Sequence, residues 1–144
     1  MAPIEKRRRE TDLSGLCAPE LSPQDREDLE RGVVLFNRGQ YWDSHEAWER
    51  VWQRHPENSR IFFQGLIQVA AGLHQLQRGI LHGCDKHFRN ALWKLRPFQP
   101  DCLGLDVAGL VRAVEKLLER ALSLGADNLG EIAPTLFPTL KSRQ

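Results

Sequence analysis

The sequence predicts an all-α fold: a five-helix, antiparallel, bundle-like single domain with irregular N- and C-terminal tails. Apolar residues recur three, four and seven positions apart in five successive segments, which is the period of an amphipathic helix. Capping residues, glycines and prolines stand at the ends of these segments. No stretch of useful length alternates between apolar and polar residues as a β-strand does, so the sequence indicates helices.

The length and composition are typical of one soluble globular domain. The chain has 144 residues, of which 41% are hydrophobic and 27% are charged, enough for a full core. We expect a basic N-terminal tail over residues 1–20, the helical domain over 21–125 and an irregular C-terminal tail over 126–144. The three cysteines have no CxxC spacing, which favours reduced thiols and a cytoplasmic location. No apolar run is long enough to span a membrane, so we expect no membrane partner.

The first two expected helices have clear ends. Ser22, followed by proline, is the N-cap of the first helix, and Gly39 supplies its end. In the second helix Asp43 is the expected N-cap, and Glu46 three residues later would complete a capping box. That helix must end before Pro56, because a residue that precedes proline is pushed out of helical geometry.

Three further helices follow at short intervals. They are expected over about residues 59–79, over about 83–95, and from the N-cap Asp106 to Gly125. The stretch 100–104 is expected to be a linker. Several positions of the third helix are glycine or alanine, which would allow a neighbouring helix to approach closely.

The second helix contains the most unusual segment of the chain, YWDSHEAWERVW, which holds three of the four tryptophans. His45, Trp48, Glu49 and Trp52 share one face of this helix, since residues three, four and seven apart lie along one side. Glu46 lies one position further round. A face that mixes an imidazole, a carboxylate and two indoles is too apolar for a solvated surface and too polar for an ordinary core. It marks the candidate site.

The first hypothesis gives this face a structural and a binding role. Gln68 and His74 fall within the apolar third helix, where they could satisfy the polar atoms of the tryptophan-rich face and fix how the two helices pair. The protein would be a non-catalytic helical domain that binds a partner protein or a small ligand at a groove near His45, Glu49 and Trp52. The candidate polar site consists of His45, Glu46, Glu49, Trp52, Gln68 and His74.

The alternative hypothesis is a metal-dependent enzyme or metal-binding protein centred on His45, Glu46 and Glu49. The HExxE pattern differs by its last residue from the HExxH of zinc proteases, and the difference removes the second imidazole. A metal could use His45 and Glu49 together with His74 or Gln68 from the next helix, and a three-ligand zinc site would need His74. We expect no metal and no cofactor. The sequence identifies no catalytic residue and leaves open whether the protein is an enzyme.

A second cluster, formed by His82, Cys84 and His87, offers three soft or borderline metal ligands at short range. Cys84 and His87 are helical neighbours, and His82 is expected just before the fourth helix. No fourth ligand is evident, and a cysteine near a helix start is commonly just small and half-buried. We therefore expect no zinc at this cluster.

The N-terminal tail contains one charge run, from Lys6 to Arg9, flanked by Glu5 and Glu10. A weaker hypothesis is RNA binding through these arginines. The formal net charge of only +1 argues against a dedicated nucleic-acid binder, and a solvated tail is the simpler interpretation. A protein partner and a homo-oligomer both stay open.

Two sequence motifs carry a family resemblance. The first is F-x-x-G-x-Y-W-x-x-H-E-x-x-E-x-x-W, from Phe36 to Trp52, and the second is F-Q-G-L-I-Q at residues 63–68. The positions that continue the pattern are Ala70, Ala71, His74, Arg78, Gly79 and Gly83.

Over about residues 26–98 the chain resembles the domain-of-unknown-function family numbered 309. The resemblance implies a compact all-helical domain and leaves its biochemical role open. Ile80 and Cys84 depart from the pattern, so chemistry that rested on Cys84 would not be a family property.

Overall fold

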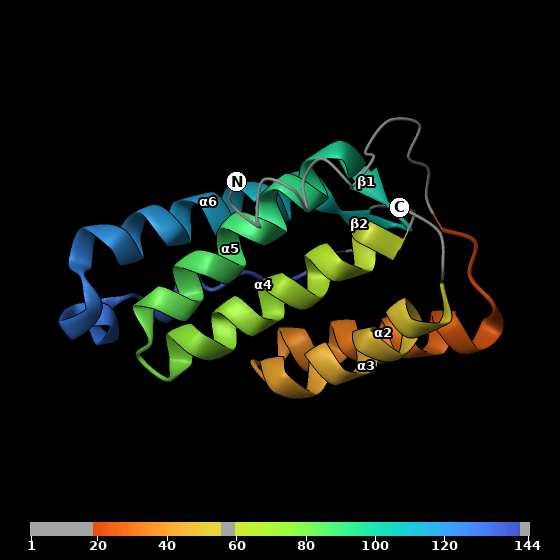
Figure 1. The fold of residues 1–144 in the computed structure, drawn as a ribbon, viewed down its shortest axis with the longest axis horizontal. Coiled ribbons are helices and arrows are strands. Elements are labelled where there is room, and N and C mark those ends of the chain that lie inside the picture. Colours follow the sequence, from red (N-terminus) through yellow and green to blue (C-terminus); the bar gives the residue numbers. More distant parts are fainter. Residues whose placement is uncertain (1–18, 56–59, 142–144) are drawn as a thin grey trace, which may run out of the picture.

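The computed structural model describes residues 19–55 and 60–141, which form a bundle of helices (Figure 1). Five long helices make up most of this described chain: α2 (Pro23–Asn37), α3 (Tyr41–Arg54), α4 (Ile61–Gln77), α5 (Leu81–Leu95) and α6 (Val107–Leu124). The shorter elements are three 3-10 turns and two short strands: η2 (Arg96–Phe98), β1 (Asp101–Cys102), β2 (Leu105–Asp106), η3 (Ala126–Glu131) and η4 (Pro134–Leu136). The predicted all-α fold is confirmed.

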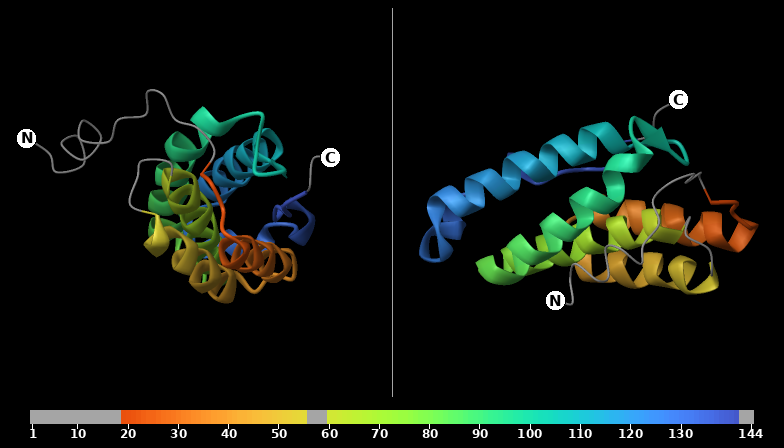
Figure 2. Two further views of the ribbon diagram at one scale, coloured as in Figure 1. Left: turned by 90° about the vertical axis from the view of Figure 1, so that its right-hand side faces the viewer. Right: turned by 45° about the horizontal axis from the view of Figure 1, so that its top comes forward.

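Each long helix packs against the next one along the chain. α2 and α3 form one pair, α4 lies next to α3, and α5 lies next to α4 (Figures 1 and 2). α6 packs on α5 near the strands β1 and β2 and spreads away from it toward its own C-terminal end (Figure 2). The chain then returns along the bundle toward β2, where the Asp106 N–H donates to the Lys141 carbonyl at 2.9 Å.

α4 supplies the centre of the core. Gly65 and Gly72 allow α5 to approach it closely, since a Cβ atom at Gly65 would lie 2.6 Å from Leu95 Cγ, and one at Gly72 would lie 2.5 Å from Phe88 Cδ1. The close approach predicted from the small residues of this helix is therefore present. The fully buried side chains of α4 are Phe62, Phe63, Leu66, Val69, Ala70 and Leu73.

Two predicted helix caps are confirmed. Ser22 Oγ accepts a hydrogen bond from the Asp25 N–H at 3.1 Å, and Asp25 Oδ2 accepts one from the Ser22 N–H at 3.3 Å, so α2 opens with a capping box. Asp106 Oδ1 accepts a hydrogen bond from the Gly109 N–H at 3.0 Å at the start of α6. Both caps satisfy backbone donors that have no partner within their own helix.

The predicted capping box of Asp43 and Glu46 is wrong. α3 already begins at Tyr41, and its N-cap residue Gln40 makes no side-chain cap. Gly39 ends α2 in the left-handed region, at a φ of 79°, and the chain resumes a helix two residues later. The turn between α2 and α3 is shorter than the sequence indicated, so Asp43 and Glu46 lie on the first two turns of α3, where both are exposed.

α5 also begins earlier than expected. It starts at Leu81, because Gly79 ends α4 at a φ of 74° and Ile80 alone separates it from the next helix. His82 therefore lies in the first turn of α5 and not before the helix.

The stretch 100–104, expected to be a linker, belongs to a small antiparallel hairpin in which Asp101 pairs with Asp106. Leu103 and Gly104 form the turn with φ values of 53° and 79°, the positive values that two-residue hairpin turns require. Strands of two residues are too short to show alternation, so the sequence pattern could not reveal them.

The C-terminal segment has irregular structure and packs on the bundle. Leu129, Ile132 and Leu140 are buried in the common core. Asn37 of α2 makes two hydrogen bonds with the main chain of Leu140: its Nδ2 donates to the carbonyl at 3.0 Å, and its Oδ1 accepts from the N–H at 2.7 Å. Within residues 19–55 and 60–141, no helix combines the length and the apolar character needed to cross a bilayer.

Candidate functional site

His45 of α3 lies at the centre of the candidate site. Its Nε2 atom is 3.4 Å from Oε2 of Glu49, one helical turn further along. Its ring stacks on the indole of Trp42, with ring centroids 4.9 Å apart and an interplanar angle of 14°. The His45 side chain is 19% exposed, whereas Trp42 is 51% exposed. The indole therefore shields the imidazole and presents its own outer face to solvent.

α4 contributes His74 and Gln68 to the same region. The His74 ring centroid lies 5.3 Å from that of Trp42, so this indole connects α3 with α4. Gln68 is half-buried nearly two turns before His74. The positions between them include Ala71 and Gly72, which place little side-chain volume on α4.

α5 contributes His87, which lies against Gly72: a Cβ atom at that glycine would be 3.4 Å from the His87 Cβ. Burial lowers the pKa of His87, and the neighbouring Lys86 and His45 lower it further. His87 is therefore neutral at neutral pH.

Four buried side-chain atoms in this region have no hydrogen-bond partner among the described residues: His45 Nδ1, Trp52 Nε1, Gln68 Oε1 and His87 Nδ1. An unpaired buried polar atom costs about 1–3 kcal/mol, and folded proteins contain few of them. Several such atoms on adjacent helices indicate that a ligand group or ordered water supplies the missing bonds. We call this surface the polar strip, and it consists of Trp42, His45, Glu49, Trp52, Gln68, His74 and His87.

The hydrogen-bond network expected between the second and third helices is not formed within the described part of the chain. Trp48 Nε1 donates to the Leu29 carbonyl of α2 at 3.1 Å, so this indole N–H bonds α2 and not α4. Gly32 makes room for it, because a Cβ atom there would collide with the indole. Trp52 Nε1 and Gln68 Oε1 have no hydrogen-bond partner among the described residues. The tryptophan-rich face therefore divides into a core residue, Trp48, and the members of the polar strip.

Glu46, which the sequence placed in the candidate site, lies on a different side of α3 from the polar strip. It is exposed and lines a shallow hollow of about 340 Å³. The other residues that line this hollow are Arg31, Asp43, Ala47 and Arg50. The two acids and two arginines compensate one another in charge, and the hollow is separate from the histidines.

The first candidate metal set is only partly assembled. His45 and Glu49 meet, but the ring contact that His74 makes is with Trp42. Among residues 19–55 and 60–141, no three histidine, cysteine, aspartate or glutamate side chains gather in a way that could hold a metal ion. The geometry therefore gives no support to a metal centre at the HExxE motif.

The second candidate metal set is dispersed. Cys84 is fully buried, and this burial, with a smaller effect of Asp85, raises the pKa of its thiol to about 12. It is therefore a thiol at neutral pH, whereas zinc binds the thiolate. His82 is exposed, and His87 belongs to the polar strip. The charge run from Lys6 to Arg9 lies outside the residues that the structure describes.

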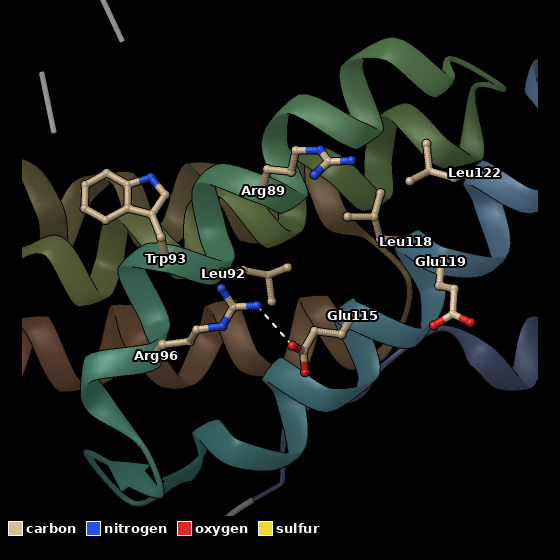
Figure 3. A pocket seen from close by; sticks show the side chains of 8 residues that line it. All are labelled: Arg89, Leu92, Trp93, Arg96, Glu115, Leu118, Glu119 and Leu122. Atoms are coloured by element: carbon tan, nitrogen blue, oxygen red, sulfur yellow. Dashed lines mark hydrogen bonds and ion pairs between the residues drawn. The ribbon is translucent and has the colours of Figure 1, made fainter. Parts of the chain in front are cut away.

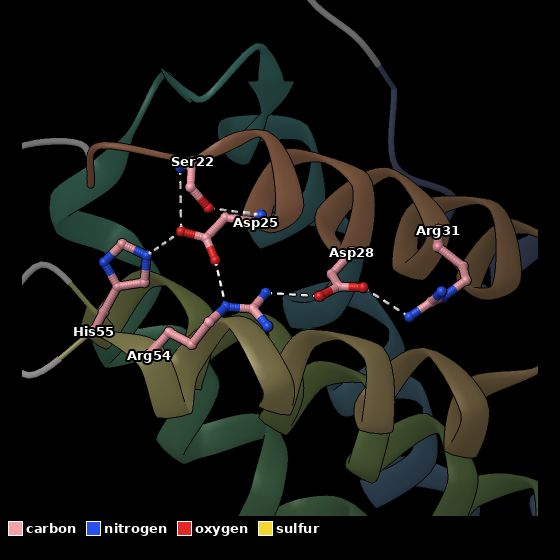
Figure 4. A network of polar contacts seen from close by, with 6 residues as sticks. All are labelled: Ser22, Asp25, Asp28, Arg31, Arg54 and His55. Atoms are coloured by element: carbon pink, nitrogen blue, oxygen red, sulfur yellow. Dashed lines mark hydrogen bonds and ion pairs between the residues drawn. The ribbon is translucent and has the colours of Figure 1, made fainter.

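A buried polar network that the sequence did not reveal joins α2 to the end of α3 (Figure 4). Arg54 Nε donates to Asp25 Oδ1 at 2.6 Å, and its Nη2 donates to Asp28 Oδ2 at 2.6 Å. Arg31 Nη2 donates to the other oxygen of Asp28 at 2.7 Å, and His55 Nε2 lies 2.8 Å from Asp25 Oδ2. The carboxylates are almost fully buried, at 4% exposed for Asp25 and 1% for Asp28.

Burial by itself would raise the pKa of both carboxyl groups, but their hydrogen bonds outweigh it. The bonds from Arg54, His55 and Ser22 hold the pKa of Asp25 below its usual value, and the contacts with Arg54 and Arg31 help to do the same for Asp28. We call these residues the α2–α3 clamp, which consists of Ser22, Asp25, Asp28, Arg31, Arg54 and His55. The only local signal for it was the capping box at Ser22.

Comparison with known proteins identifies a relationship for part of the chain. Residues 29–86 match the family described as domain of unknown function (DUF309). No curated protein is similar to the chain. The matched segment contains every member of the polar strip except His87, which follows it directly. The family resemblance predicted from the sequence motifs is thereby confirmed, and the part of the chain that resembles this family includes α3 and α4, which carry most of the polar strip.

Proposed function

We propose that the chain is a non-catalytic binding domain whose polar strip takes an extended segment of a partner protein. The observation that carries this proposal is the set of four unpartnered polar atoms on three adjacent helices. They include a donor, Trp52 Nε1, and an acceptor, Gln68 Oε1. The two imidazole nitrogens can take either role according to tautomer.

A peptide main chain matches such a set, because it presents N–H and C=O groups in alternation. Trp42 and Trp52 stand at the two ends of the α3 part of the strip. The helical rise makes that part about 15 Å long, which is the length of four or five residues of extended peptide at about 3.3 Å each. The unpartnered atoms lie beneath the surface, so binding would turn their side chains outward or draw main-chain groups between them.

Two aromatic contacts favour a protein ligand over a small polar molecule. Trp42 is half-exposed and already held by stacking on His45, so it can bury its outer face without losing much side-chain freedom. At the other end, the Arg60 guanidinium lies 4.7 Å from the Trp52 ring centroid. An indole anchor beside a cation–π pair is typical of the hot spots of protein interfaces.

The chemistry of the other reactive side chains supports a role without catalysis. Burial is the larger cause that raises the pKa of both Cys84 and Cys102, each to about 12, so neither is a nucleophilic thiolate at neutral pH. The His45 imidazole meets Glu49 at a long 3.4 Å, which positions it only loosely for general-base work.

The experiment uses a library of random peptides displayed on phage, selected against the full chain. The affinity of the selected peptides is then measured by calorimetry for the wild type, Trp42→Ala and Gln68→Leu. Each substitution is expected to weaken binding by about tenfold or more, because it removes an anchor or a buried acceptor. The matched control is Val34→Ala, which changes a residue of α2 that is 47% exposed and should leave the affinity unchanged.

A second measurement tests whether the peptide binds at the polar strip. The indole N–H of Trp52 should shift in the nitrogen-15 NMR spectrum when peptide is added, because it gains an acceptor. Failure to select peptides, or selected peptides whose affinity is the same for all four proteins, would refute the proposed function.

A further inference from the structure

A second hollow lies between α5 and α6, on residues outside the segment that matches the family (Figure 3). Its volume is about 540 Å³. Leu92 and Leu118 form its buried apolar floor, and Leu122 beside them is 43% exposed. The remaining residues that line it are Arg89, Trp93, Arg96, Glu115 and Glu119. We call this hollow the α5–α6 groove.

The two walls of the α5–α6 groove carry opposite charges. Arg89 and Arg96 belong to α5 or to the residue after it, and Glu115 and Glu119 belong to α6. Arg96 Nη2 bonds Glu115 Oε2 at 3.0 Å and closes one end of the groove (Figure 3). Toward the other end, Arg89 uses its Nε to bond Asp85 of its own helix at 2.6 Å. Glu119 forms no ion pair with any residue in the described part of the chain.

We propose that the α5–α6 groove is the contact between two copies of this chain, related by a two-fold axis that runs along the groove. Such an axis places the positive α5 wall of one copy opposite the negative α6 wall of the other. Each Arg89 then faces the partner copy's negative wall, and the pairing occurs twice by symmetry. A two-fold axis across the groove would instead set arginine against arginine, so the charges select one orientation.

The charge pattern also selects a second copy over an unrelated helix. Any other partner would need acidic and basic rows at the separation of α5 and α6, with an apolar row between them. A second copy of the chain carries this pattern because its surface is identical. The contact would also bury Leu122, one of the few large apolar side chains that the described structure leaves exposed. This inference does not depend on the proposed function, because the polar strip and the α5–α6 groove use different residues.

The test is analytical ultracentrifugation of the full chain over a roughly hundredfold range of concentration, where mass action should shift monomer to dimer. Glu119→Arg should weaken the dimer by about tenfold or more, because two attractive contacts become repulsive. The double variant Arg89→Glu/Glu119→Arg should restore it, since the walls then exchange signs. Leu122→Asp should abolish it, and the matched control Val34→Asp on α2 should not change it.

Thermal melting followed by circular dichroism shows whether each variant is folded. If Glu119→Arg alone fails to fold, Arg89→Glu on the α5 wall replaces it, because this substitution should also weaken the dimer by charge repulsion. A chain that is monomeric at every concentration would overturn the proposal, as would a dimer that Glu119→Arg and Leu122→Asp leave intact. The proposal would also be wrong if the chain dimerised only after residues 1–18 were removed. In the full chain those residues, and not a second copy, would then be the occupant of the α5–α6 groove.

Discussion

His55 Nε2 lies 2.8 Å from Asp25 Oδ2, although thirty positions separate the two residues in the chain. Both side chains are buried, and Arg54 next to His55 bonds the other oxygen of the same carboxylate. Asp25, a member of the capping box of α2, therefore bonds the first turn of α2 to the last turn of α3. Asp25 has two tasks, since it also accepts the Ser22 N–H that opens α2.

The α2–α3 clamp makes the free energy of unfolding depend on pH. The pKa values of Asp25 and Asp28 in the folded protein are below the ordinary value of 3.8, because the hydrogen bonds from Arg54 outweigh burial. A lowered folded pKa contributes stability that is present above the unfolded value and is lost as the pH falls through the folded value. Asp28→Asn should lower the free energy of unfolding by about 2 kcal/mol at neutral pH, because it breaks a buried ion pair whose arginine is partly solvated.

Urea denaturation of the wild type and Asp28→Asn between about pH 7 and pH 2 measures this effect. The difference between the two proteins should be largest above about pH 5 and should shrink as the carboxyl groups are protonated. Asp43→Asn on the exposed side of α3 is the control. A difference that stays constant over the whole range would mean that charge has no part in the clamp.

Gln68→Leu should leave the free energy of unfolding unchanged or raise it by about 1 kcal/mol. The substitution keeps the approximate volume and removes a buried acceptor that has no partner among the described residues. Chemical denaturation provides the measurement, and Gln64→Leu, at a half-buried position one turn earlier on α4, is the matched control. A loss of more than about 1 kcal/mol would show that Gln68 Oε1 is satisfied within the folded protein.

Gly72→Ala should lower the free energy of unfolding by about 1–3 kcal/mol, because the added methyl group overpacks the contact between α4 and α5. Its Cβ atom would lie 2.5 Å from Phe88, a fully buried ring that has little room to move. Gly130→Ala is the control, since a Cβ atom there meets nothing within 4 Å. Equal melting temperatures for the two variants would show that α5 can shift away without cost.

Periodicity and capping chemistry were enough to predict the helices. The apolar stripe gave five helices in the right order, and Ser22 and Asp106 cap two of them as expected. Asp43 failed as a cap because Gly39 lets the chain turn early, so that α3 already begins at Tyr41 and Asp43 lies inside the helix. A helix start is set by the turn before it as much as by the best capping residue nearby.

The candidate site was only partly predictable for a related reason. Helical spacing correctly grouped His45 with Glu49, which meet at 3.4 Å. It could not fix how α3 is rotated against its neighbours, which decides that Trp48 bonds the Leu29 carbonyl of α2 while Glu46 faces solvent. The α2–α3 clamp depends in the same way on packing between distant segments, so the capping box at Ser22 was its only local signal.

The two hydrogen bonds between Asn37 and Leu140 join positions that are 103 residues apart. The helical hairpins between them can form from near neighbours, and such local contacts assemble quickly. The Asn37 bonds close a loop whose entropic cost grows with its length, so they are expected among the last contacts made. Hydrogen exchange at the Leu140 amide would therefore report on the final closure of the bundle separately from the formation of its helices.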